Sequence, residues 1–152
     1  MVFDPAIELV VNTVRASNAL LRASRRVFKP FGLSKAQFNV LHILQDAGDH
    51  LSQRELSDIL IVDRSNVTGL IDRMEKAEWV QRQPVPGDRR AYRVTLTSEG
   101  RKLWRQANAA YQQAAARVTV NLTPAQMQAL SAALPVMERS AHALDLELAA
   151  SD

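Results

Sequence analysis

The chain has 152 residues, of which 47% are hydrophobic, and this share is sufficient for a folded core. Lys and Arg number 19 against 16 Asp and Glu, so the net charge of +3 by itself indicates no class of partner. The lack of cysteine excludes disulfides, thiolate metal sites and thiol-based redox sensing. No apolar run approaches the roughly 18–20 residues of a membrane span, and the N-terminus does not resemble a signal peptide. We therefore expect a cytoplasmic protein.

Two helices are predicted in the first third of the chain. Asp4 followed by Pro5 is typical of an N-cap and a first helical residue, and apolar residues then recur at helical spacing. The segment 30–32, with the sequence Pro-Phe-Gly, ends this pattern. Ser34 and Gln37 form a capping box that begins the second helix. Its predicted inward residues are Phe38, Leu41 and Leu44.

A pair of short helices follows. Ser52 and Glu55 form another capping box, and Asp63 is predicted to cap the next helix after a brief turn. The predicted inward residues are Leu56, Ile59 and Leu60 on the first short helix, and Val67, Leu70, Ile71 and Met74 on the second. Two short helices joined by a few residues form a helix-turn-helix candidate.

The outward face of the second short helix carries side chains that suit a DNA major groove. Asn binds adenine through two hydrogen bonds, Ser and Thr bond to several base edges, and Arg reaches guanine or phosphate. The predicted major-groove residues are Arg64, Ser65, Asn66, Thr68 and Arg73. Gly69 lies on the same face, and two interpretations stay open: a tolerated surface glycine, or a place where the backbone comes close to DNA.

A β-hairpin with a basic turn is predicted before a long helix that Thr97 caps. The apolar period changes to two over residues 79–85 and 92–97, around a Pro-Gly-Asp turn. Arg89 and Arg90 at the tip suit a minor groove, where arginine reads width and potential, while Asp88 orients a neighbouring arginine. A solvated surface turn is the alternative, but a hairpin after a helix-turn-helix is typical of a DNA-reading wing.

The last helix has a strong start signal, because Thr123 and Gln126 form a capping box with Pro124 at the first helical position. Apolar residues then repeat at alternating intervals of three and four. They are Met127, Leu130, Leu134, Met137, Ala141, Leu144 and Leu148. This 3.5-residue period favours a dimer seam against another helix, and packing on the chain's own core is the alternative. The residues of the first helix predicted to join the seam are Ile7, Val10 and Val14.

Three motifs resemble the MarR family of bacterial winged-helix regulators. They are LSQREL at 51–56, VDRSNVT at 62–68, and DRR at 88–90 followed by VTLTSEG at 94–100. The resemblance implies a mainly α fold with a small β-hairpin wing. It places a winged helix-turn-helix DNA-binding domain over residues 31–99 and a helical dimerisation region over residues 1–30 and 100–152.

The resemblance also implies a transcriptional regulator, expected to be a repressor, that binds a palindromic operator as a symmetric homodimer. The helix from Arg64 would lie in the major groove, and Arg90, held by Asp88, would enter the minor groove. A small aromatic or anionic effector would release the DNA, and its candidate pocket residues are Arg15, Asn18, Arg22, Phe38 and His42. A winged-helix protein-interaction module without sequence-specific DNA binding is the alternative function.

One departure from the family follows the second short helix. The family usually has Gly-Leu-Val there, whereas this chain has Glu78, Trp79 and Val80. Two outcomes are open: Glu78 adopts a left-handed cap at some strain, or the helix ends differently.

No residue pattern predicts catalysis or a bound cofactor. His42, His50 and His142 follow no metal-ligand spacing, and the chain has no nucleophile motif, phosphate loop or paired carboxylates. We therefore expect no enzyme activity, no metal site and no cofactor. The expected partners are double-stranded DNA, a second copy of the chain and a small-molecule effector, with no membrane.

Overall fold

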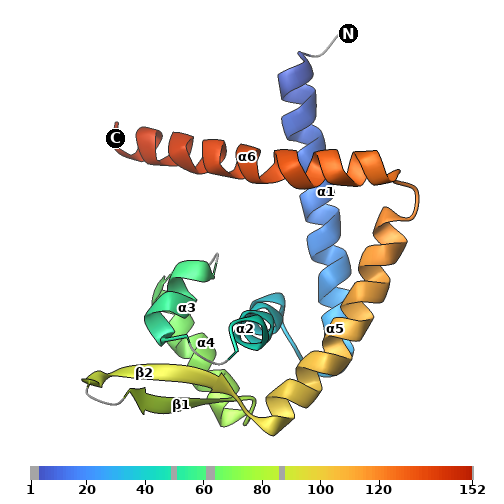
Figure 1. Ribbon diagram of the computed structural model, residues 1–152. Helices are drawn as coiled ribbons and strands as arrows, with labels where there is room; N and C mark the ends of the chain where they lie inside the picture. Colours follow the sequence, from blue (N-terminus) through green and yellow to red (C-terminus); the bar gives the residue numbers. More distant parts are fainter. Residues whose placement is uncertain (1–3, 49–50, 61–63, 86–87, 152) are drawn as a thin grey trace. The chain divides into compact units, whose positions relative to one another are not determined.

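The computed structural model describes residues 4–48, 51–60, 64–85 and 88–151, without the side chains of 64–66 and 88–91. The chain forms two compact units, Met1–Gln113 and Ala114–Asp152. The elements of the described chain, in order, are α1 (Pro5–Phe28), η1 (Lys29–Phe31), α2 (Lys35–Asp46), α3 (Gln53–Ile59), α4 (Arg64–Lys76), β1 (Val80–Val85), β2 (Asp88–Leu96), α5 (Ser98–Thr119) and α6 (Pro124–Ala149) (Figure 1). None of the helices in the described ranges has the length and apolarity to cross a membrane.

Side-chain caps set the starts of several helices, as the sequence predicts. Asp4 caps α1 by accepting a 2.8 Å hydrogen bond from the Ala6 N–H. Complete capping boxes begin α2, α3 and α6, formed by Ser34 with Gln37, Ser52 with Glu55, and Thr123 with Gln126. The predicted cap at Asp63 lies outside the described residues.

The capping box of α3 also changes the pKa of one of its members, Glu55. The Ser52 N–H donates to the Glu55 carboxylate at 2.8 Å. Hydrogen bonds from the Ser52 backbone and hydroxyl lower the pKa of Glu55 below its ordinary value. Because the folded pKa is depressed, this cap stabilises the fold above the ordinary carboxyl pKa and loses that contribution as the pH falls through the folded value.

The hydrophobic core of the first unit is arranged around α2, which packs against α1, α4 and β2 (Figure 1). The predicted inward residues of α2 and α4 are all buried, and this prediction is confirmed. They are Phe38, Leu41 and Leu44 on α2, and Val67, Leu70, Ile71 and Met74 on α4.

The prediction for α3 was wrong at one residue. Leu56 and Leu60 are buried, but the Ile59 side chain is 50% exposed. The helix has only seven residues and ends at Ile59, and Leu60 leaves it in an extended conformation that carries its side chain into the core. Ile59 is therefore the last residue of a short helix rather than one of its inward residues.

The two strands form an antiparallel hairpin in which Val80 pairs with Leu96 and Pro84 pairs with Tyr92. β2 begins at Asp88, four residues earlier than predicted, so the basic residues that follow lie in the strand rather than in the turn. The pairing register shifts between Pro84 and Val85. Proline has no N–H to donate to the ladder, which accounts for the irregularity at this position.

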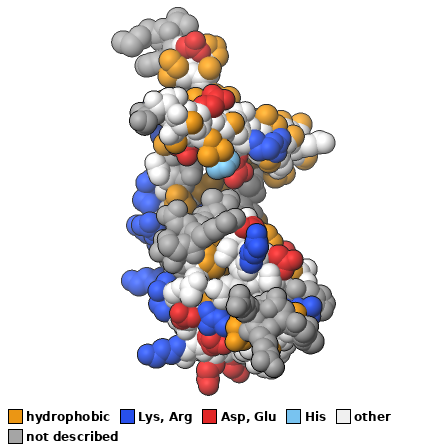
Figure 2. Space-filling view, turned by 90° about the vertical axis from the view of Figure 1, so that its left-hand side faces the viewer, with side chains coloured by type: hydrophobic (Ala, Val, Ile, Leu, Met, Phe, Trp, Pro, Cys, Tyr) orange, Lys and Arg blue, Asp and Glu red, His pale blue; other side chains and the backbone are white. Residues whose placement is uncertain are grey.

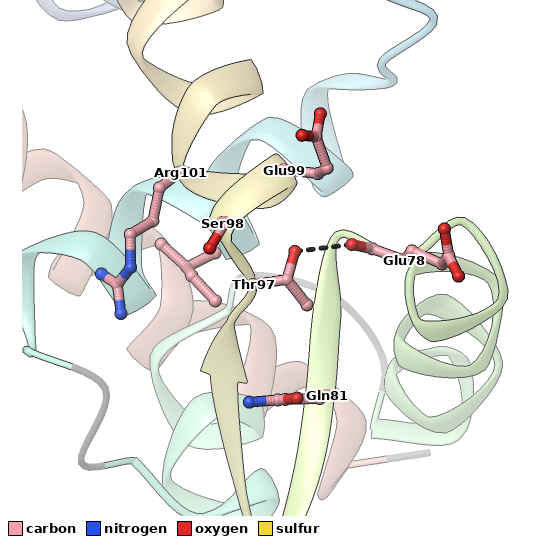
Figure 3. A pocket seen from close by; sticks show the side chains of 7 residues that line it. Glu78, Gln81, Thr97, Ser98, Glu99 and Arg101 are labelled. Atoms are coloured by element: carbon pink, nitrogen blue, oxygen red, sulfur yellow. Dashed lines mark hydrogen bonds between the residues drawn. The ribbon is translucent and has the colours of Figure 1, made fainter.

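The end of α4, the open end of the hairpin and the start of α5 meet at one junction. Glu78 has a φ of 60°, so of the two outcomes open from the sequence the left-handed conformation after α4 is the one that occurs. The Thr97 hydroxyl donates to the Glu78 carbonyl at 2.6 Å (Figure 3). The Thr97 N–H donates to the Trp79 carbonyl at 3.1 Å. The Thr97 hydroxyl also accepts from the Gly100 N–H at 3.0 Å, which confirms the predicted cap of α5.

Gly100 allows α5 to approach this junction closely. A Cβ atom on Gly100 would lie 1.9 Å from the carbonyl oxygen of Trp79 and 2.9 Å from its carbonyl carbon. Because these atoms belong to the backbone of a hydrogen-bonded strand end, they have little freedom to move. The glycine of the LTSEG motif is therefore required by packing.

The second unit contains the end of α5 and the whole of α6. Pro135 lies inside α6, where it removes one backbone donor from the helix. None of the residues of α6 is buried.

We predict that Gly100→Ala lowers the free energy of unfolding by about 1–3 kcal/mol, the usual cost of overpacking. Urea denaturation followed by circular dichroism measures this change. Gly69→Ala is the matched control, because its Cβ would meet only the end of the Arg73 side chain at 3.4 Å. We expect this control to gain stability, since alanine is favoured in a helix by roughly 1 kcal/mol. Equal stability of the two variants would contradict the packing role of Gly100.

We predict that Glu78→Gly raises the free energy of unfolding by about 1 kcal/mol, because glycine adopts a positive φ without the Cβ penalty. Glu78→Ala keeps a Cβ in the left-handed conformation, and we expect it to give no gain. Thermal denaturation of both variants measures the difference. A glycine variant that is no more stable than the alanine variant would show that the conformation is unstrained.

Candidate nucleic-acid interface

The outward face of α4 is the centre of the candidate interface. Its opposite face is buried in the core, and Thr68 and Arg73 are exposed. The backbone places Arg64, Ser65 and Asn66 in the first turn of α4, and their side chains lie outside the described part of the structure. The predicted major-groove residues are thus brought to one helix, with the base-reading types near its N-terminal end.

Gln53, the first residue of α3, connects the two helices of the helix-turn-helix. Its side-chain Nε2 donates to the Thr68 hydroxyl at 3.1 Å. Its Oε1 accepts from Arg82 Nε at 3.1 Å. One amide therefore holds a candidate base-reading hydroxyl on α4 and an arginine on β1.

Arg82 ties the wing to α4 through three charged hydrogen bonds. Its guanidinium donates to Asp72 and to Glu75, each at 2.6 Å, and its backbone N–H donates to the second oxygen of Glu75 at 2.9 Å. Burial opposes the charge of Arg82, but the hydrogen bonds to both carboxylates outweigh it and raise the arginine pKa. The hairpin is therefore anchored to the C-terminal half of the predicted recognition helix.

A second contact joins β2 to the start of the helix-turn-helix. The Val94 N–H donates to the Leu51 carbonyl at 3.0 Å, and Ser52 forms an isolated antiparallel bridge with Arg93. The segment before α3 thus lies beside β2 and is joined to it by one isolated bridge. Both helices of the helix-turn-helix are connected to the wing.

The predicted wing residues lie at the start of β2. Asp88, Arg89 and Arg90 are the first three residues of the strand, next to the irregular end of the hairpin ladder. Their side chains lie outside the described part of the structure. Arg90 in the minor groove and its support by Asp88 therefore stay predictions.

Sequence reasoning missed the positioning residues Gln53 and Arg82. The available signal was weak: Asp72 and Glu75 lie three residues apart on α4, a spacing that places two carboxylates on one side of a helix. Only the tertiary fold identifies the cation between them, because Arg82 comes from another element.

The candidate effector residues divide into two groups. The Phe38 ring is buried and stacks on Phe28 with ring centroids 4.3 Å apart, while His42 lies over Phe38 and accepts a 3.3 Å hydrogen bond from the Trp104 indole. The candidates on α1 are all exposed: Arg15, Asn18 and Arg22. The effector pocket stays a prediction.

Two open hollows lie beside the junction at the base of the wing. The larger, of about 520 Å³, is lined by Glu78, Gln81, Leu96, Thr97, Ser98, Glu99 and Arg101 (Figure 3). The smaller, of about 300 Å³, is lined by Phe31, Trp79, Glu99, Lys102, Leu103 and Gln106. Neither hollow is lined by a predicted effector residue.

The predicted dimer residues expose much of their apolar surface. Ile7, Val10 and Val14 on α1 are 54–55% exposed. On α6 the exposed members of the seam are Met127, Leu130, Leu134, Leu144 and Leu148, at 38–60%, and Met137 is half-buried. Apolar surface of this extent is typical of an interaction site, and the dimer seam stays a prediction.

Two short helices, an anchored hairpin and a polar outward face on the second helix define a winged helix-turn-helix protein. The MarR family model matches residues 31–91, and the chain belongs to this family. The matched residues run from η1 into β2 and include all of α2, α3, α4 and β1.

Relatives with known names are transcriptional regulators rather than enzymes. HTH-type transcriptional regulator PecS of Dickeya dadantii is 36% identical over 95 residues, covering 60% of this chain and 57% of PecS. The uncharacterized HTH-type transcriptional regulator YwoH of Bacillus subtilis is 32% identical over 94 residues, covering 62% of this chain and 67% of YwoH. The chain thus spans between about half and two thirds of the length of the curated relatives it matches.

A solved structure extends the likeness along most of the chain. It is a mutant MarR from E. coli complexed with operator DNA, which is 28% identical and has a TM-score of 0.78. The alignment covers 90% of this chain and 98% of that chain.

We predict that Arg82→Met lowers the free energy of unfolding by about 1–2 kcal/mol, because two carboxylates lose a charged donor at a site that is only partly buried. Urea denaturation measures this loss. Arg105→Met removes the same charge from an exposed position on α5, and we expect it to change stability by less than about 0.5 kcal/mol. If Arg82→Met proves as stable as this control, the anchor contributes nothing to the fold.

Proposed function

We propose that the protein is a DNA-binding transcriptional regulator that acts as a repressor and binds a palindromic operator as a homodimer. The observation that carries this proposal is the Arg82 anchor, which joins the outward polar face of α4 to the wing through Asp72 and Glu75. A helix for the major groove and a hairpin for the adjacent minor groove are then held as one reading surface.

The comparisons support this function over a protein-interaction module. PecS and YwoH are both named HTH-type transcriptional regulators, and the E. coli MarR structure contains operator DNA. Within this surface, Ser65, Asn66 and Thr68 would select bases. Arg89 and Arg90 would add affinity and read groove width.

Dimerisation would bring two such surfaces to successive major grooves, one helical turn apart on the same side of the duplex. The exposed seam residues of α6 support this assembly, since they repeat every 3.5 residues and leave apolar surface uncovered in the single chain. The exposed apolar residues at the start of α1 provide further surface for a partner.

An effector that releases the DNA belongs to the same proposal. The exposed ring of His42 and the cations of Arg15 and Arg22 suit an aromatic anion, while Phe38 is buried beneath His42 and supports that ring. A thermal-shift screen of aromatic acids tests this part, because a ligand that prefers the folded dimer raises its apparent stability.

We predict that Arg90→Ala weakens binding to the promoter region of the protein's own gene by about tenfold or more, because a charged hydrogen bond contributes roughly 1.5–3 kcal/mol. Fluorescence anisotropy across a salt series measures the affinity, which for the wild type should fall steeply as salt rises. Arg105→Ala is the matched control on α5. Unchanged affinity of Arg90→Ala would exclude its minor-groove role, and a wild-type protein that binds no duplex from this region at low salt would exclude the proposed function.

We predict that Leu134→Asp combined with Leu144→Asp converts the dimer into monomers, because two carboxylates would be buried in an apolar seam. Sedimentation velocity measures the oligomeric state. Val136→Asp combined with Leu146→Asp is the matched control, since these exposed residues of α6 lie outside the seam. A dimer that survives the seam substitutions, or that the control disrupts equally, would refute the seam.

A further inference from the structure

A continuous stretch of the chain outside the helix-turn-helix carries positive charge without any compensating acid. Residues 9–45 contain no Asp or Glu. Their basic residues are Arg15, Arg22, Arg25, Arg26, Lys29 and Lys35. Five of these six belong to α1 and η1 rather than to the elements that form the reading surface.

The basic residues of α1 lie on one face of the helix. At about 100° per residue, Arg15, Arg22, Arg25 and Arg26 fall within an arc of roughly 100°, and all four are exposed. The buried residues of α1 are Ser24 and Phe28, which lie outside this arc. We call the face formed by Arg15, Arg22, Arg25, Arg26 and Lys29 the basic face of α1.

The charges of the basic face are not neutralised within the described ranges of the chain. No carboxylate there lies within ion-pairing distance of any of its five side chains. In the view of Figure 2, Lys and Arg side chains follow one another along one edge, with Asp and Glu side chains among them toward its lower end. Of the elements packed nearby, α2 contributes Asp46, which is bound by His42.

The shape of this surface indicates the kind of anion it suits. From Arg15 to Arg26 the face runs for roughly 16 Å along the helix, and neither of the two hollows beside the wing is lined by its residues. An extended row of cations suits a polyanion better than a small ligand. The residues between the arginines on this face are Asn18 and Ala19, so it lacks the large apolar side chains that an interfacial membrane helix inserts.

We infer that the basic face of α1 is a second surface for duplex DNA, which binds phosphates without reading sequence. Duplex DNA presents about one phosphate per 1.7 Å of its axis, so it matches a straight row of cations. α1 packs on α2, which in turn packs on α4, so the basic face lies on a different helix from the reading surface (Figure 1). The duplex it holds is therefore a flanking or separate segment. The choice of DNA as the polyanion rests on the proposed function.

The test uses the full chain and a random-sequence 30-bp duplex. The variant is Arg25→Gln, Arg26→Gln and Lys29→Gln, which leaves all candidate effector and groove-reading residues unchanged. The control is Arg105→Gln, Arg117→Gln and Arg139→Gln, which removes the same charge from exposed positions on α5 and α6. Fluorescence anisotropy between 50 and 200 mM salt gives the slope of log K against log salt, and sedimentation verifies that both variants remain assembled as the wild type is.

We expect the variant to bind the random duplex more weakly and with a slope shallower by about 2–3, because each lost phosphate contact removes about 0.9 from the slope. The control should change the slope by less than about 1. The same loss should occur on an Arg90→Ala background, so that this surface is measured separately from the wing. Equal slopes for variant and control overturn the inference. The inference is also overturned if the variant keeps its binding to the duplex but loses binding to vesicles of phosphatidylcholine and phosphatidylserine. That result would favour a lipid surface.

This design separates two failures. If the wild type prefers its promoter to the random duplex but the variant and control behave alike, the basic face is not a DNA surface and the proposed function stands. If the wild type shows no preference while only the variant loses affinity for the random duplex, the second surface stands and operator reading fails.

Discussion

The rest of the winged helix-turn-helix depends on the contact between the start of α5 and the carbonyl groups of Glu78 and Trp79. Thr97 bonds to both carbonyls, and Gly100 lets the helix backbone approach them without a side chain between. These few atoms join the end of the predicted recognition helix, the open end of the hairpin and the first turn of a 22-residue helix. The direction of the wing relative to α4 is set here, and it requires Glu78 to adopt a left-handed backbone conformation.

The Arg82 cluster adds a second constraint, higher on the same hairpin. The junction positions the base of the wing, whereas Arg82 prevents the hairpin from rotating about that base, because its carboxylate partners are one turn apart on α4. Gln53 extends the constraint to α3 and to the Thr68 hydroxyl. The helix and the hairpin that carry the predicted groove-reading residues are thereby joined in one geometry, which would reduce the ordering cost of the proposed association with DNA.

Local signals predicted most of the fold. The capping boxes at Ser34, Ser52 and Thr123 lie where the sequence places them, because a cap needs only residues three positions apart. The lack of a glycine after α4 left two outcomes open at Glu78, and the structure has the left-handed one. The failures concern longer-range effects: Ile59 is exposed because its helix stops short, and β2 reaches back to Asp88 because strand pairing extends further than the alternation of apolar residues indicated.

Motifs, periodicity and caps depend on near neighbours in the chain, so they were sufficient to predict the family, the order of the elements and the residues on the outward face of α4. Which charged side chains form ion pairs depends on the tertiary fold. Arg82 and the arginines of α1 look alike in sequence, but the fold brings two carboxylates to Arg82 and none to the basic face within the described residues. Electrostatic pairing depends on the distance between charged groups in the folded chain, and the local pattern of a sequence does not give that distance.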